Sequence, residues 1–259
     1  MSDSPVATCV IDGPVAIVTM ARPESMNAFN QALRLDLTAA LREAASNTDV
    51  RAVVLTGAER AFSAGADLGA GFPEQMTIEQ QLQREYRPIF DEIIGMPKPV
   101  IAAINGAAAG IALSIALACD LAVMGEKAFL LAPFSTISLV PDGGANWLLQ
   151  KQLGYKRAFQ LAVEADRFEA ARRLDWGLAY RVVPIDAVLD IATAWGHELA
   201  ERAPLSVRAT KLVMRAAESS SWADTFDYEA RLQTDLVGSP DNQEGVTAFF
   251  EKRKPEFKG

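Results

Sequence analysis

The sequence predicts an α/β protein in which a mostly parallel sheet is followed by a helical C-terminal region. Two patterns lead to this fold class. Up to about Met124, apolar runs of strand length alternate with longer segments whose apolar residues recur at helical spacing, an alternation typical of βα units. After Tyr155 the periodic segments are mainly helical. The 259 residues suffice for one large domain or a domain with an appendage, and we expect a core at 1–200 and a helical region at 201–259.

The predicted elements can be justified in chain order. Two apolar runs, 6–11 and 15–20, flank Asp12-Gly13, which is a strong hairpin signal. Residues 30–46 carry an apolar stripe at helical spacing, and 77–94 form a second amphipathic segment that stops before Pro97. Buried strands are expected at 52–56, 99–104 and 121–124, with a helix between the last two. Further helices are expected at 157–163, 169–176, 185–202, 205–219, 222–237 and 242–253.

Composition and charge argue against several classes of protein. The net charge is −8 and the basic residues cluster only at 252–254, so nucleic acid is not expected as a partner. The two cysteines, Cys9 and Cys119, lie far apart and fit no metal or redox spacing. Together with an N-terminus unlike a signal peptide, they suggest a reducing, cytoplasmic setting. Because the longest apolar stretch is broken by Asn105, Gly106 and Ser114, we expect buried core there and no membrane span.

The most informative stretch is 98–120, KPVIAAINGAAAGIALSIALACD. Its apolar run stops at Asn105-Gly106, and the small residues 107–110 lead into an apolar segment that we interpret as a helix ending near Asp120. A helix that begins with almost no side chains leaves free N–H donors at the positive end of its dipole. Such an N-terminus can hold an oxyanion without a metal. The stretch also contains no carboxylate between Lys98 and Asp120.

A second loop of small residues, 58–71 or AERAFSAGADLGAG, follows the predicted strand at 52–56. Gly65, between Ala64 and Ala66, permits close approach of the backbone, although the segment could equally be an ordinary loop. It matches neither the G-x-G-x-x-G dinucleotide fingerprint nor a P-loop. Because both loops follow strands and present bare backbone, each can supply an N–H group. Two such groups directed at one oxygen make an oxyanion hole.

Four segments, in order along nearly the whole chain, resemble the crotonase superfamily, the enoyl-CoA hydratase/isomerase family. They are Arg22-Pro23 with Asn27-Ala28; AFSAGADL at 61–68; KPVIAAINGAAAG at 98–110, leading to Cys119-Asp120; and EGVTAFFEKRKPEF at 244–257. The resemblance implies a spiral of ββα turns with a helical trimerisation region, assembled as a homotrimer or a dimer of trimers. It also implies an acyl-CoA thioester substrate, so coenzyme A arrives as part of the substrate, and no bound cofactor or metal is expected.

By this resemblance, the backbone N–H groups of Ala66 and Ile111 form the oxyanion hole. Ile111 departs from the family pattern, in which Gly or Ala is usual. Positions that hold coenzyme A in relatives are matched by Met26, Ala28, Ala64, Ala66, Asp67, Leu68, Phe249 and Lys252, the last two from a neighbouring subunit. Many relatives have Lys where Gly69 stands, so one phosphate contact is expected to be missing.

The acid–base positions differ from those of a hydratase. Family hydratases use two glutamates, and the matching positions here hold Ser114 and Phe134. A serine hydroxyl is a poor base at neutral pH, and phenylalanine has no proton to move. A carboxylate stands nearby at Asp142, where Pro-Asp-Gly alone indicates a turn. The resemblance to the ring-opening isomerase branch of aerobic phenylacetate breakdown instead makes Asp142 the acid/base.

We therefore expect an isomerase in which Asp142 removes a proton from an acyl-CoA and returns it further along the chain, by a double-bond shift or epoxide opening. Apolar neighbours such as Phe134, Leu139, Val140 and Trp147 are expected to raise the pKa of Asp142 and make it a better base. Two other interpretations remain open: a hydratase that pairs Asp142 with an unconventional partner, and an acyl-CoA binder without turnover. His197, the single histidine, is expected to be structural or exposed.

Overall fold

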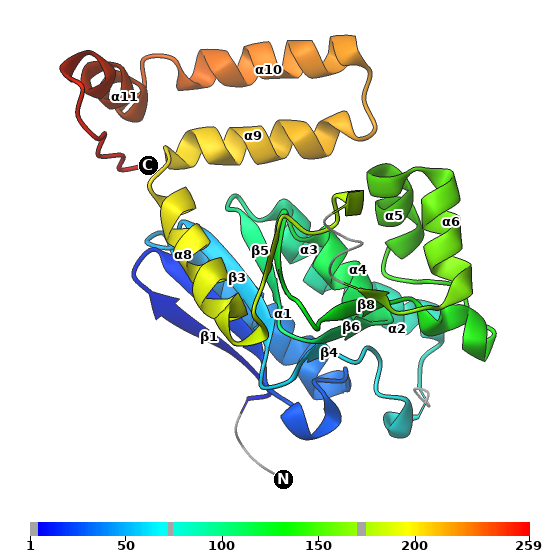
Figure 1. The fold of residues 1–259 in the computed structure, drawn as a ribbon. Coiled ribbons are helices and arrows are strands. Elements are labelled where there is room, and N and C mark those ends of the chain that lie inside the picture. The colour runs from blue at the N-terminus through cyan, green and yellow to red at the C-terminus, as the bar shows by residue number, and fades with distance from the viewer. Residues whose placement is uncertain (1–4, 72–74, 170–174) are drawn as a thin grey trace.

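The computed structural model describes residues 5–71, 75–169 and 175–259, whose arrangement is shown in Figure 1. The larger sheet has six strands in the spatial order β1-β2-β3-β5-β7-β10. They are β1 (Ala7–Asp12), β2 (Val15–Met20), β3 (Ala52–Gly57), β5 (Val100–Ile104), β7 (Leu121–Gly125) and β10 (Arg181–Val183). β1 and β2 form the predicted antiparallel hairpin, and the other neighbouring pairs are parallel. The prediction of a mostly parallel sheet is thus confirmed.

Helices cover both faces of this sheet. Along β3, Val53 and Leu55 join the large apolar cluster that also holds residues of α1 (Gln31–Ser46) and α3 (Arg87–Gly95). Val54 points the opposite way and joins a smaller cluster with α8 (Val188–Ala200). Every residue of β3 and β5 is buried, as expected for parallel strands packed on both faces.

A second, smaller sheet has the order β4-β6-β8-β9. Its strands are β4 (Ala61–Ser63), β6 (Ala107–Ala109), β8 (Phe129–Leu131) and β9 (Phe168–Glu169). β4, β6 and β8 follow β3, β5 and β7 after short connections and pair in parallel. Each pair of strands is then followed by helices, so the chain repeats the ββα order that the resemblance implies.

Two predicted helical segments are corrected by this sheet. Residues 107–109, interpreted as the small-residue approach to a helix, form β6, and the helix α4 (Ile111–Ala118) begins later. The predicted helix at 169–176 fails at its start, where Glu169 pairs with Phe129 in the sheet, and residues 170–174 lie outside the described part of the chain. Strands of two or three residues give no periodic signal, which is why the sequence did not predict them.

The segment predicted as one helix at 77–94 consists of three consecutive helical segments of different kinds. It comprises α2 (Ile78–Gln81), a π-helix (Leu82–Tyr86) and α3. Thr77 and Gln80 close its start as a capping box. The remaining core helices are α5 (Ala145–Leu153), which the sequence did not predict, α6 (Tyr155–Glu164), and 3-10 turns at Pro23–Ser25, Leu68–Ala70, Pro133–Ile137 and Ile185–Ala187.

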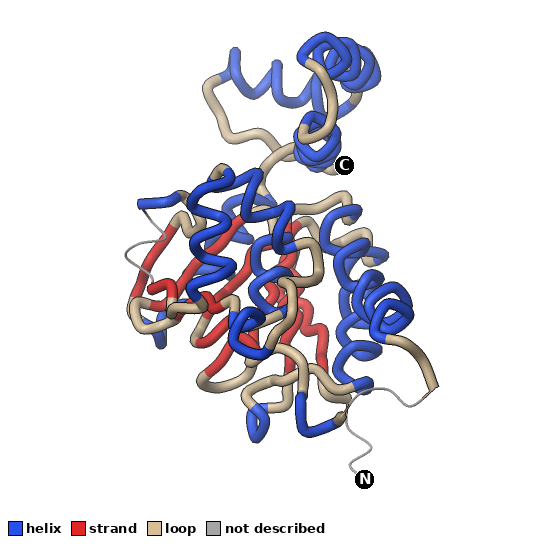
Figure 2. The backbone as a smooth tube through the Cα atoms, turned by 90° about the vertical axis from the view of Figure 1, so that its right-hand side faces the viewer, coloured by secondary structure: helices blue, strands red, loops and turns tan. Residues whose placement is uncertain are grey.

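Three C-terminal helices extend away from the core, as Figures 1 and 2 show from two sides. They are α9 (Pro204–Ala217), α10 (Trp222–Leu236) and α11 (Pro240–Glu251). α9 is tied to the core by Lys211 and Arg215, whose side chains lie 2.7 and 2.9 Å from the Asp120 carboxylate. No residue of α9 or α10 is buried in the described chain. Among the described helices, none is both long and apolar enough to cross a membrane.

Candidate active site

The early loop at 22–28 fixes the position of the first glycine-containing loop. The fully buried Asn27 side chain accepts a hydrogen bond from the Arg22 N–H at 2.9 Å and donates to the carbonyls of Ala58 and Ala61 at 3.0 and 2.8 Å. Ser63 Oγ donates to the Asn27 carbonyl at 2.7 Å. These bonds hold the start of the loop at 58–71 against the end of the early loop.

The N–H of Ala66 points away from the hydrogen bonds that join its loop to Phe29. The N–H of Phe29 bonds the Gly65 carbonyl at 2.7 Å, and the N–H of Asp67 bonds the Phe29 carbonyl at 3.2 Å. A parallel bridge of this kind uses the groups on either side of Ala66, so the Ala66 N–H faces the opposite side. Within the described chain, no acceptor takes it. An Arg22–Asp67 ion pair at 3.0 Å further ties the two loops together.

The second loop meets the first at a pair of glycines. Gly65 has φ +91° and Gly110 has φ +57°, and a Cβ atom on Gly65 would lie 2.6 Å from the carbonyl oxygen of Ala109. A Cβ atom on Gly110 would lie 3.8 Å from Gly65 Cα. The loops therefore touch backbone to backbone, which only residues without side chains permit. The structure thus brings together the two loops that the sequence analysis paired.

Ile111 is the first residue of α4 and directly follows this contact. The N–H of Gly110 is used by the Leu131 carbonyl at 3.0 Å, and the N–H of Leu113 by the Gly110 carbonyl at 3.0 Å. For the N–H of Ile111, no acceptor is found among the residues that the structure describes. Since the first N–H groups of a helix have no partner inside the helix, the N–H of Ile111 is free to donate outside it.

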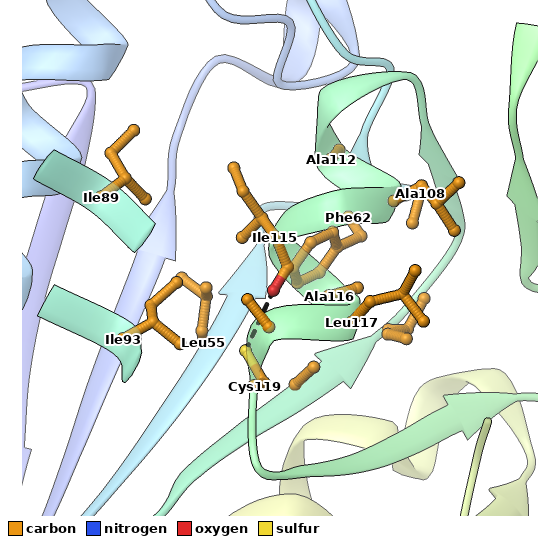
Figure 3. Close-up of a cluster of buried hydrophobic side chains, with 14 of the residues drawn as sticks. Leu55, Phe62, Ile89, Ile93, Ala108, Ala112, Ile115, Ala116, Leu117 and Cys119 are labelled. Atoms are coloured by element: carbon orange, nitrogen blue, oxygen red, sulfur yellow. Dashed lines mark hydrogen bonds between the residues drawn. The ribbon is translucent and has the colours of Figure 1, made fainter. Parts of the chain in front are cut away.

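The helix that carries this donor is fixed in the core. All eight residues of α4 are buried. Figure 3 shows Ile115 of α4 in one apolar cluster with Leu55, Phe62 and Ile89, which come from both sheets and α3. At its C-terminal end, Cys119 Sγ donates to the Ile115 carbonyl at 3.4 Å. A donor on such a helix has little freedom to move, and a fixed donor is what electrostatic stabilisation of an oxyanion requires.

Asp142 lies against the first turns of α4. Its backbone carbonyl accepts a hydrogen bond from Ser114 Oγ at 2.8 Å. The next residue, Gly143 (φ +61°), packs so closely that a Cβ atom there would lie 3.0 Å from Ser114 Cβ and 3.2 Å from Ile111 Cγ1. The segment is therefore both a turn and a carboxyl-bearing part of the site, so the two interpretations of Pro-Asp-Gly are compatible.

The Asp142 side chain is partly buried, and one of its two carboxyl oxygens has no partner. Oδ1 is shielded from solvent and has no hydrogen-bond partner in the described chain. Burial raises the pKa of Asp142 to about 6, while a hydrogen bond from its own backbone opposes the shift. A carboxyl with such a pKa is half ionised near pH 6 and serves better as a base than an exposed aspartate does.

Asp142 opens into a cavity of about 500 Å³ between α5 and the helical segment 78–95. The wall is mainly apolar and aromatic, with contributions from Tyr86, Phe90, Ile94, Trp147 and Leu148. Of the apolar neighbours predicted for Asp142, Trp147 lines the cavity, whereas Phe134, Leu139 and Val140 are not among its described lining residues. Phe90 and Tyr86 were missed by the sequence analysis, since on an amphipathic helix they look like ordinary core residues.

The two positions that match the hydratase glutamates hold no carboxyl group. Ser114 is fully buried and its hydroxyl is engaged with the Asp142 carbonyl. Phe134 is buried in the main apolar cluster.

His197 lies on α8, beyond the larger sheet, where it is exposed and 3.1 Å from Asp12 Oδ2. Across the described ranges, no three His, Cys, Asp or Glu side chains gather in a way that could hold a metal.

The predicted coenzyme A positions fall into two separate groups. Met26, Ala28, Ala64, Ala66, Asp67 and Leu68 lie together on the two bonded loops at 22–29 and 61–68. Within them Met26 and Leu68 are exposed and Ala28 is buried. Phe249, which is 78% exposed, and Lys252 lie at the end of α11, in the helical region that extends from the core. Within one chain they are not brought to the loops.

Titration of Asp142 predicts an unusual dependence of stability on pH. In the unfolded chain this carboxyl loses its proton at lower pH than in the fold, because its folded pKa is raised to about 6. Ionisation of Asp142 therefore lowers the free energy of unfolding as pH rises from its ordinary pKa of 3.8 to about 6. We expect Asp142→Asn to be more stable than wild type above pH 6, by ~1–3 kcal/mol, and the difference to vanish towards pH 4.

Urea unfolding of both proteins across this pH range measures the effect. The control is Asp91→Asn, because the Asp91 side chain is 64% exposed at the rim of the same cavity. A stability difference between Asp142→Asn and wild type that does not change with pH would contradict the burial of an ionisable carboxyl.

Comparisons with known proteins identify relatives over nearly the whole chain. The family model described as enoyl-CoA hydratase/isomerase matches residues 11–259. A probable enoyl-CoA hydratase from Rhodobacter capsulatus is 40% identical over 248 residues, which are 95% of each chain. A 1,2-epoxyphenylacetyl-CoA isomerase from Escherichia coli is 32% identical over 253 residues, 96% of this chain and 97% of that one. A crystal structure of an enoyl-CoA hydratase from Geobacillus kaustophilus has a TM-score of 0.92 and 31% identity, with both chains fully covered. The chain therefore belongs to the enoyl-CoA hydratase/isomerase family and has the crotonase fold.

Proposed function

We propose that this family member is an acyl-CoA isomerase in which Asp142 is the acid/base. The N–H groups of Ala66 and Ile111 would hold the thioester oxygen. Asp142 takes a proton from a carbon of the acyl chain, and the electron pair delocalises onto that oxygen as an enolate. The same carboxyl then returns the proton to a carbon further along, so the double bond moves and no water is consumed.

One observation carries this proposal: a single buried, unpaired carboxyl oxygen lies beside the helix that offers the Ile111 donor. Hydration needs groups that activate and protonate around a water molecule. At the positions of the hydratase glutamates, the Ser114 hydroxyl is engaged with a carbonyl and Phe134 has no proton to give. Similarity to the Escherichia coli isomerase supports the same choice and makes epoxide opening a second form of the reaction.

The alternative is a hydratase that uses Asp142 with an unconventional partner. It is favoured by the 40% identity to a relative described as a probable enoyl-CoA hydratase. In both cases the substrate is an acyl-CoA thioester, whose coenzyme A moiety would contact the loops at 22–29 and 61–68.

Product analysis by mass spectrometry separates these reactions. The protein is incubated with a cis-3-enoyl-CoA, a trans-2-enoyl-CoA and a ring-epoxide thioester in ¹⁸O-labelled water. Isomerisation of the 3-enoyl or epoxide substrate leaves the mass unchanged and moves the chromatographic peak. Hydration adds one labelled water to the 2-enoyl substrate and would overturn the proposal. Tight binding without turnover across the panel would overturn both reactions in favour of an acyl-CoA binder.

We also propose that the C-terminal helices assemble the protein as a homotrimer or a dimer of trimers. Trp222, Phe226, Phe249 and Phe250 are all more than half exposed in one chain, and large apolar surfaces of this kind mark protein interfaces. Assembly would carry Phe249 and Lys252 to a neighbouring subunit's coenzyme A site. Light scattering should give a mass of three or six chains, and Trp222→Asp should lower it. A monomeric wild-type protein would contradict the assembly.

A further inference from the structure

Tyr86 stands in the same cavity as Asp142 and has no role in the mechanism above. It ends the π-helix Leu82–Tyr86, and its side chain is almost completely buried. Its ring lies 5.9 Å from that of Phe29, and the Arg34 guanidinium lies over it at 5.0 Å from the centroid. Its position is therefore fixed by residues of α1 and of the loop before it.

The Tyr86 hydroxyl has a proton that no described residue accepts. Arg34 Nη1 lies 3.4 Å from Tyr86 Oη, and because a guanidinium can only donate, the hydroxyl accepts this bond. Arg34 is itself held by Glu85 at 2.7 Å and by the Phe29 carbonyl at 3.0 Å. Burial raises the pKa of Tyr86, an effect that the nearby Arg34 opposes and Asp142 reinforces, so the proton stays on the oxygen.

Tyr86 and Asp142 both line the cavity, and no hydrogen bond joins them in the described residues, where Asp142 Oδ1 has no partner. Elsewhere in the wall, the side chains of Phe90, Ile94 and Trp147 offer no acceptor, and those of Gln83 and Asp91 lie beside Arg87. A buried donor left without an acceptor costs ~1–3 kcal/mol. A ligand oxygen that accepts from Tyr86 would recover this free energy on binding.

We propose that Tyr86 is a specificity residue that donates a hydrogen bond to an oxygen atom on the acyl group. The preferred substrates would then be acyl-CoA thioesters whose acyl chain bears a carbonyl, hydroxyl or cyclic ether oxygen beyond the thioester. Asp142 stays free to move the proton. This inference rests on the proposed function only in that the acyl group occupies the cavity of Asp142.

Binding measurements with non-isomerising thioesters test the inference. Calorimetry compares hexanoyl-CoA with 4-oxo- and 5-oxohexanoyl-CoA, and phenylacetyl-CoA with its 3- and 4-hydroxy derivatives. We expect at least one oxygenated compound to bind wild type roughly tenfold more tightly than its parent, since its oxygen satisfies the buried hydroxyl. Tyr86→Phe keeps the ring and removes only the hydroxyl, so it should abolish this preference.

The matched control is Tyr155→Phe, which removes an exposed hydroxyl on α6 and should keep the preference. The inference is overturned if no oxygenated compound binds wild type more tightly than its parent, a result that needs no variant. It is also overturned if Tyr86→Phe folds, as judged by circular dichroism, and keeps the preference. Because these ligands need no turnover, the outcome is independent of whether Asp142 proves to be the base.

Discussion

Asp142→Asn is expected to lower kcat on a cis-3-enoyl-CoA by roughly 10²- to 10⁴-fold, the usual contribution of a positioned acid/base. The substitution keeps the shape of the side chain and the backbone contacts of Asp142 with Ser114, so the fold and the affinity for acyl-CoA should change little. An amide cannot take a proton from carbon, and the loss should therefore fall on kcat. Steady-state kinetics with a separate binding measurement distinguish the two effects.

The pH dependence of kcat/KM should also reflect the ionisation of Asp142. In wild type, kcat/KM should rise with pH and level off above about 6, because burial raises the pKa of Asp142 to that value and only the ionised form is a base. Asp91→Asn changes an exposed carboxyl at the cavity rim and should keep both the rate and the profile. Undiminished activity in Asp142→Asn would remove Asp142 from the mechanism.

Gly65→Ala is expected to lower kcat by roughly 10²- to 10³-fold, the usual effect of losing one oxyanion donor. The new Cβ atom would lie 2.6 Å from the Ala109 carbonyl oxygen, and neither partner is a flexible side chain. The two loops must therefore separate, which turns the N–H of Ala66 away from the oxygen that, in the proposed mechanism, it shares with Ile111. The φ of +91° adds backbone strain.

A substitution at a second glycine of the same loop, Gly71, separates the effect of the Gly65 contact from the effect of backbone strain. Gly71 has φ +71°, and a Cβ atom there would meet none of the described residues within 4 Å. Gly71→Ala should therefore lose some stability and keep most of the activity. Thermal unfolding and kcat measured on both variants make the comparison. Equal losses of activity in the two variants would mean that loop strain, and not the contact of the glycines, controls the rate.

Five of the six strands of the larger sheet were predictable from sequence because they have strong signals, whereas β10, with three residues, was not predicted. Val53, Val54 and Leu55 form a continuous apolar run, and Asp12-Gly13 marks the hairpin. The smaller sheet was not predictable, since its strands are two or three residues long and β6 consists of alanines, which have no β preference. α5 was missed because it follows Gly143-Gly144, where a continuing turn is the simpler interpretation.

The candidate site was predictable where it is made of backbone and less so where it is made of side chains. Gly65 marks a place where the backbone can approach closely, and the structure brings it against Ala109 and Gly110 of the second loop. Tyr86 carries no such mark, because its burial and its free hydroxyl depend on Arg34, 52 residues away. Contacts between residues so far apart arise only from tertiary packing, which sequence periodicity does not encode.

The buried helix α4 has a consequence for redesign of the reaction. Its proposed oxyanion donor belongs to the main chain of a helix whose eight residues all lie in the core. Only proline, which has no N–H, would delete this donor outright, and most substitutions there would threaten the fold. The proposed acid/base is by contrast a single side chain on a turn, so in this mechanism it is the part that can be exchanged. Introducing carboxylates at positions 114 and 134 is accordingly the shortest route from this chain to a different reaction on the same enolate.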